Sequence, residues 1–153
     1  MIRSNRRLKL CGVLTACCLV FIWGNSLMPG SVSQLFSDCV QGLLGALFSG
    51  GGEAGASGGS GLLRKVAHFT EFAALGMCLG WLFGMLGKRP AWPFALGVAA
   101  ACLDETIQFF VPGRSPGVLD VCIDSCGAAF GMLLLYLGHS YFKKKRTNHS
   151  GGN

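Results

Sequence analysis

Charged side chains are scarce in this 153-residue sequence: Asp, Glu, Lys and Arg make up 13% of the residues, and hydrophobic residues 51%. Soluble domains usually carry about 25% charged residues. A soluble helical bundle would also need a polar face along each helix, and the long apolar runs here have almost none. The composition therefore argues against a soluble protein and favours a single integral membrane domain over residues 1–153.

Four apolar runs are long enough for transmembrane helices, which need about 20 mostly apolar residues each. They cover residues 10–27, 66–86, 91–111 and 118–141. The first run follows several basic residues, as the core of a signal peptide would, but the residues after it do not fit a small-residue cleavage site. We therefore expect this run to be retained, which predicts an all-α integral membrane bundle of four transmembrane helices.

The eight cysteines do not indicate a disulfide framework. Seven of them lie inside the apolar runs, where cysteine behaves as a small hydrophobic residue, and only Cys39 lies outside. Cys122 and Cys126 are one helical turn apart and could bind a metal, although zinc sites built on cysteine usually have more ligands.

The basic residues indicate how the helices are oriented. Ten of the thirteen Lys and Arg residues lie before the first helix, between the second and third, and after the fourth: Arg3, Arg6, Arg7, Lys9, Lys88, Arg89, Lys143, Lys144, Lys145 and Arg146. With four spans these three segments share one side of the membrane, and the positive-inside rule makes that side cytoplasmic. Both termini are then cytoplasmic, and residues 28–63 and 112–117 form the external loops.

The first external loop is expected to contain a short interfacial helix followed by a flexible linker. Apolar residues recur there at helical spacing, namely Val32, Phe36, Val40, Leu43, Leu44 and Leu47. Residues 50–61 are rich in Gly, Ser and Ala, which is typical of a linker.

Glycines recur every fourth residue in two of the predicted helices. Gly76, Gly80 and Gly84 lie on the second helix, and Gly127 and Gly131 on the fourth. Such small residues let helix backbones approach closely. We expect them to pack the bundle internally, and a homo-oligomer interface is the alternative.

Five of the seven acidic residues lie with other polar residues near the external ends of the helices. Many of these residues are three or four positions apart, so they share a helix face. A charge at the centre of a span costs about 2.5–3.5 kcal/mol on insertion scales, so we expect the set to face inward as a polar site in the outer leaflet. The set consists of Arg64, Lys65, His68, Glu71, Asp104, Glu105, Gln108, Arg114, Asp120 and Asp124.

Three kinds of chemistry suit this set. A divalent cation could be held by carboxylate oxygens, and the metal candidates are Asp104, Glu105, Asp120 and Asp124. Acid–base catalysis could use the carboxylates beside the histidine, and the catalytic candidates are His68, Glu71, Asp104 and Glu105. An anionic head group or a peptide carboxylate could be held by the basic residues, and the ligand-binding candidates are Arg64, Lys65, Gln108, Arg114, Asp120 and Asp124.

Structural roles are the alternative for several of these residues. Arg64 and Lys65 could be interfacial anchors whose charged ends reach the membrane surface. Arg114 could pair with Asp120 and fix the second external loop.

Three segments resemble the signatures of the VanZ-like membrane proteins. They are Arg64-Lys-Val-Ala-His-Phe-Thr-Glu-Phe72 with Leu75-Gly76, Asp104-Glu-Thr-Ile-Gln-Phe-Phe-Val-Pro-Gly-Arg114, and Asp120-Val-Cys-Ile-Asp-Ser-Cys-Gly127 with Gly131. Asn25-Ser-Leu-Met-Pro-Gly-Ser31 resembles the start of the family's first loop. Phe72 stands where Tyr is common in the family, so a hydroxyl is missing. By matching positions, the resemblance implies functional roles for Lys65, His68, Glu71, Asp104, Glu105, Gln108, Arg114, Asp120 and Asp124.

The resemblance also implies a multi-pass protein of the bacterial cytoplasmic membrane. The family's namesake is associated with low-level resistance to teicoplanin. We therefore expect an envelope factor that binds a lipid, a lipid-linked wall precursor or the lipoglycopeptide itself. The alternatives are a membrane-embedded enzyme acting on such a precursor by acid–base or metal-assisted chemistry, and a purely structural membrane subunit. The lipid bilayer is the expected surrounding, and no nucleic-acid partner is expected.

Overall fold

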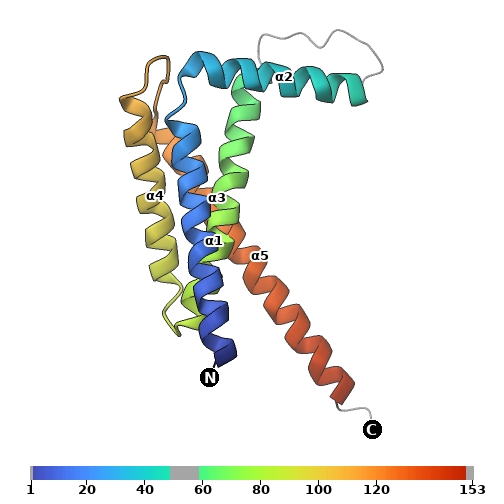
Figure 1. Ribbon diagram of the computed structural model, residues 1–153. Coiled ribbons are helices and arrows are strands. Elements are labelled where there is room, and N and C mark those ends of the chain that lie inside the picture. Colours follow the sequence, from blue (N-terminus) through green and yellow to red (C-terminus); the bar gives the residue numbers. More distant parts are fainter. Residues whose placement is uncertain (1, 49–58, 151–153) are drawn as a thin grey trace.

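The structure, a computed structural model, describes residues 2–48 and 59–150 (Figure 1). These residues form five helices and no strand, so the predicted all-α architecture is confirmed. The helices are α1 (Ile2–Ser26), α2 (Gly30–Phe48), α3 (Gly59–Met85), α4 (Ala91–Phe109) and α5 (Val118–Ser150). All eight cysteines lie in these helices and are free thiols.

Within the described residues, three helices are long and apolar enough to cross a membrane: α1 over Asn5–Ser26, α3 over Gly61–Met85 and α5 over Val118–Lys145. The chain is therefore a multi-pass membrane protein. The fourth predicted span, α4, is not among the three, because Asp104, Glu105 and Gln108 near its end lower its mean hydropathy. In Figure 1, α4 nevertheless runs between the same two ends of the bundle as α1 and α3.

Three of the helices, α1, α3 and α5, extend beyond the apolar runs that predicted them, whereas α4 ends at Phe109, two residues before the end of its predicted run. α1 begins at Ile2, so Arg6 and Arg7 lie within its first turns rather than before it. α3 begins at Gly59, inside the predicted linker of residues 50–61, and the rest of that linker lies outside the described residues. The physical reason is that helix hydrogen bonds continue through polar residues, whereas an apolar run marks only the part suited to hydrocarbon.

α2 lies across one end of the bundle, where the predicted interfacial helix was expected (Figure 1). Gly30 and Ser37 are buried against the bundle. On the opposite face, Leu35 and Phe36 are 70% and 71% exposed. An uncovered apolar face at the end of a membrane bundle suits a helix lying in the membrane interface.

The connections at the α2 end of the bundle are joined to one another. The Gly30 N–H donates to the Pro112 carbonyl at 3.1 Å. The Arg114 guanidinium donates to the carbonyls of Asn25, at 2.8 Å, and Met28, at 3.1 Å. The turn between α1 and α2 is therefore tied to the loop between α4 and α5. The start of α1, the α3–α4 turn and the end of α5, which carry the three basic segments, lie at the opposite end (Figure 1).

α3 and α5 approach most closely at glycines. A Cβ added at Gly76, Gly127 or Gly131 would collide with the backbone of the facing helix. Gly80 would meet the side chain of Leu135 first, and Gly84 has nothing within 4 Å. For Gly76, Gly127 and Gly131, the prediction of internal packing is confirmed.

Replacing Gly131 with valine should destabilise the bundle. The new side chain would meet the backbone of Ala73 on α3, which cannot move aside as a flexible side chain could. Overpacking of this kind costs typically about 1–3 kcal/mol. The melting temperature in detergent measures the loss, with Gly138→Val as the control, because Gly138 lies on the same helix with nothing within 4 Å. Equal losses in the two variants would contradict a close α3–α5 contact at Gly131.

Candidate functional site

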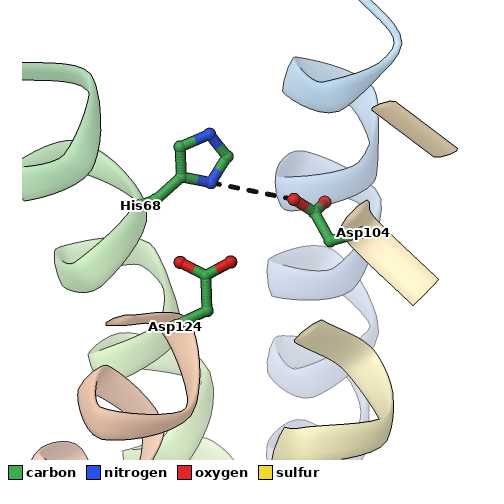
Figure 2. A group of neighbouring side chains, drawn as sticks. All are labelled: His68, Asp104 and Asp124. Carbon is green, nitrogen blue, oxygen red and sulfur yellow. Dashed lines mark ion pairs between the residues drawn. The ribbon is translucent and has the colours of Figure 1, made fainter. Parts of the chain in front are cut away.

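Three of the predicted site residues meet inside the bundle, close to its α2 end. His68 comes from α3, Asp104 from α4 and Asp124 from α5, and Figure 2 shows their side chains pointing toward one another. Asp104 and Asp124 are 0% and 1% exposed, and the His68 side chain is 14% exposed. One donor atom of each residue lies within 4.8 Å of the others. We call these three residues the three-helix cluster.

Asp104 is the most firmly held member of the cluster. Its Oδ1 accepts a hydrogen bond from Ser26 Oγ at 2.6 Å, and its Oδ2 accepts one from Gln108 Nε2 at 2.9 Å. The same Oδ2 lies 3.8 Å from His68 Nδ1. Gln108 Nε2 also lies 3.2 Å from Ser26 Oγ, so α1 and α4 are joined beside the cluster.

Asn25 and Ser26 belong to the site, although neither was predicted as a site residue. Asn25 Nδ2 donates to Glu71 Oε1 at 2.9 Å, which brings the end of α1 against α3. The available signal was the resemblance of residues 25–31 to the first loop of the family. Their side chains are uncharged, so the pattern of charged residues did not indicate them.

Asp124 differs from Asp104 because neither of its oxygens has a hydrogen-bond partner in the part of the chain that the structure describes. The same holds for His68 Nδ1 and for Glu71 Oε2. Buried polar atoms in folded proteins are nearly always paired. A buried carboxyl without a protein partner therefore calls for a proton, a ligand or a cation.

Two predicted site residues serve the neighbouring loop instead. Glu105 is buried, and its Oε2 accepts a hydrogen bond from the Gly117 N–H at 3.0 Å, just before α5 begins. Arg114 binds the carbonyls of the α1–α2 turn rather than pairing with Asp120. Burial lowers the pKa of the Arg114 guanidinium, and nearby Arg64 lowers it further, while carboxylates raise it. Arginine nevertheless stays protonated, so a positive charge remains beside the site.

The remaining predicted residues lie around the cluster. Lys65 is exposed, Arg64 is half-buried one turn before His68, and Asp120 is half-buried at the start of α5. Of the four metal candidates, Asp104 and Asp124 come together, and His68 joins them in place of the other two within the described residues. Cys122 and Cys126 are exposed on α5 and do not belong to this group.

The cluster offers a plausible coordination chemistry. One imidazole nitrogen and two carboxylates suit a divalent transition metal such as Zn²⁺ or Mn²⁺ better than the hard cation expected from carboxylates alone. Three protein ligands with a further position open are also the arrangement of catalytic zinc sites. Glu71, with its unpartnered Oε2 nearby, could act as an acid or base.

An apolar cavity of about 400 Å³ lies between α1, α3 and α4. Trp23, Leu75 and Leu103 line it, and each lies within one helical turn of a polar residue of the site on its own helix. Phe72, where the family often has Tyr, is fully buried in the adjoining core with Ile22. The cavity is large enough for part of a hydrocarbon chain, so polar and apolar binding surfaces adjoin.

Comparison with known protein families gives a match. The sequence profile of the VanZ/LLP1 family matches residues 13–139, a range that contains every residue of the site. Neither the curated proteins nor the solved structures include a match to the chain.

Proposed function

Because the chain belongs to the VanZ/LLP1 family, we propose that it is an envelope factor of the bacterial cytoplasmic membrane, with four transmembrane helices and both termini in the cytoplasm. Two observations support this topology. α4 runs alongside α1 and α3 between the same ends of the bundle, and the basic segments lie at the end opposite α2 (Figure 1). The positive-inside rule makes the basic end cytoplasmic, so the three-helix cluster lies in the outer leaflet.

The cluster binds an amphiphilic ligand, a membrane lipid or a lipid-linked wall precursor, and thereby limits the access of a lipoglycopeptide such as teicoplanin to its target. The observation that carries this proposal is the unpartnered Asp124 carboxyl beside His68 and Asp104, together with an apolar cavity whose lining includes Leu103, the residue before Asp104. Ionisable groups within a membrane are costly and usually functional. A polar group adjoining space for a hydrocarbon chain matches the two halves of a lipid.

Teicoplanin susceptibility tests this function in a Gram-positive host. We expect the protein to raise the inhibitory concentration above that of the empty vector, and Asp124→Asn to abolish the increase at equal membrane level. The control is Asp38→Asn, the same chemical change at an exposed position on α2. Wild-type protein that gives no protection contradicts the resistance role. Full protection by Asp124→Asn contradicts the role of the cluster.

A membrane-embedded enzyme is the second candidate, favoured by the combination of His68, Asp104 and Asp124. If these residues hold a divalent metal, it would supply an activated water and polarise a phosphoryl or carbonyl oxygen of a lipid-linked substrate. Glu71 would then move the proton. An enzyme should lose nearly all function in Glu71→Gln, whereas a binding protein should lose only part of it.

A further inference from the structure

A second cavity, of about 270 Å³, lies between α2, the start of α3 and the loop before α5. Among the residues that the structure describes, the lining has no acidic or apolar side chain: three are glycines, and the others are Ser33, Gln34, Ser37, Arg64 and Ser115. The single formal charge in this lining is therefore positive. A cavity of this size and polarity does not suit a hydrocarbon chain, and its hydroxyl, amide and guanidinium groups can all donate hydrogen bonds.

Arg64 is the central feature of this cavity. It is half-buried, and its guanidinium has no hydrogen-bond or ion-pair partner among the residues that the structure describes. Arg114, in contrast, already donates to two carbonyls. A guanidinium presents five donors in a planar fork that matches the oxygens of a phosphate or carboxylate group. Arg64 is thus placed to bind an anion that enters the cavity.

Backbone groups favour the same kind of ligand. Gly61 lines the cavity from the first turn of α3, a helix of 27 residues. The first four N–H groups of a helix lack intrahelical acceptors, and together with the helix dipole they favour an anion. Gly30 and Gly113 bring α2 and the loop together at the cavity, where a Cβ on Gly30 would collide with the Gly113 carbonyl. The enclosure is therefore built by backbone contact.

We propose that this cavity is a binding site for a phosphate group. A tetrahedral phosphate has more acceptor oxygens than a planar carboxylate, so it can engage the Arg64 fork with two of them and leave others for the surrounding hydroxyls. Arg64 precedes His68 by one turn on α3, so a phosphate held here lies near the three-helix cluster. The phosphate can belong to a lipid head group or be free in solution. The lipid source rests on the proposed function, and the phosphate site itself does not.

Binding to the purified full-length protein in an uncharged detergent tests the site. The probes are phosphatidic acid, diacylglycerol with the same acyl chains but no phosphate, and inorganic phosphate. We expect Arg64→Gln to weaken phosphate-dependent binding about 10- to 100-fold, as for the loss of charged hydrogen bonds. Arg64→Lys should restore part of the affinity. Lys88→Gln, which removes one charge at the opposite end of the bundle, is the control.

The outcomes distinguish the phosphate of a lipid head group from free phosphate. Arg64-dependent binding of phosphatidic acid but not diacylglycerol supports a lipid phosphate, and Arg64-dependent binding of inorganic phosphate alone supports a free anion. Unchanged binding in a folded Arg64→Gln protein overturns the proposal, as does equal binding of phosphatidic acid and diacylglycerol when inorganic phosphate does not bind either. If Arg64→Gln fails to fold, Arg64→Lys carries the test, and undiminished binding there overturns it. Since none of these readouts uses teicoplanin, failure of the resistance role would be recognised separately.

Discussion

Asp124→Asn is expected to remove high-affinity divalent-cation binding from the purified protein, measured by isothermal titration with Zn²⁺ and Mn²⁺. Both Asp124 oxygens are buried without a hydrogen-bond partner in the described chain, and they lie beside His68 and Asp104. Loss of an outer-shell partner alone typically weakens metal binding 10- to 100-fold. Loss of a direct carboxylate ligand should therefore lower the affinity by at least about 100-fold.

The substitution keeps the shape of the side chain, so the fold should persist and the cation affinity should change alone. Glu105→Gln is the informative control, because Glu105 was predicted as a metal ligand from the sequence but accepts the Gly117 N–H in the structure. Its cation affinity should stay close to that of the wild type. If the wild-type protein binds neither metal, the metal-dependent enzyme is contradicted. The unpartnered Asp124 oxygens are then explained by a proton on the carboxyl rather than by a cation.

Arg114→Ala should lower the free energy of unfolding by about 2–3 kcal/mol. A hydrogen bond from a charged group contributes about 1.5–3 kcal/mol, and of the two made by Arg114 one is part-buried and the other exposed. Arg114 holds the α1–α2 turn through the carbonyls of Asn25 and Met28. Arg114→Lys should not restore the stability, because an ammonium group lacks the planar fork that reaches both carbonyls. Denaturation in detergent, followed by circular dichroism, measures both variants.

This experiment also separates two roles for Arg114. The sequence suggested a ligand-binding residue, whereas the observed contacts indicate an anchor for the α2 end of the bundle. Full stability of Arg114→Ala combined with weakened binding of phosphatidic acid would favour the first role. Reduced stability at unchanged affinity for phosphatidic acid would favour the second.

The helices were predictable because their signal is local. The length of an apolar run indicates a span, and spacings of three or four residues indicate which side chains share a face. The positions of His68, Asp104 and Asp124 followed from such spacings together with the scarcity of acidic residues. The ends of the helices were less predictable, since α1 and α5 continue into polar sequence.

The spacing of the charged residues did not predict which of them join the three-helix cluster and which hold the loop. Asp104 and Glu105 are neighbours in the sequence, yet Asp104 joins the three-helix cluster and Glu105 holds the loop before α5. Which of them faces inward depends on how α4 is rotated against its neighbours, and that is a tertiary property. The roles of Asn25 and Ser26 likewise depend on the tether by which Arg114 fixes the end of α1.

The cavity around Arg64 was likewise not predictable from the sequence. Its walls come from α2, α3 and the loop before α5, so no continuous stretch of sequence carries a signal for it. The apolar spacing of α2 predicted a helix with a lipid-facing side. The opposite side of that helix, with Ser33, Gln34 and Ser37, supplies one wall of the cavity.

If α4 crosses the membrane as proposed, its length makes the site sensitive to bilayer thickness. At 1.5 Å per residue, its 19 residues span about 28 Å, close to the hydrocarbon depth of a typical bilayer. The candidate span of α5, Val118–Lys145, is 28 residues long and can match membranes of different depth by changing its tilt. α4 has no such spare length, and its outer end is fixed to the α1–α2 turn through the loop that carries Arg114. Hydrophobic mismatch in a thicker membrane would therefore act on the end of α4 that holds Asp104, so lipid chain length would adjust the geometry of the cluster.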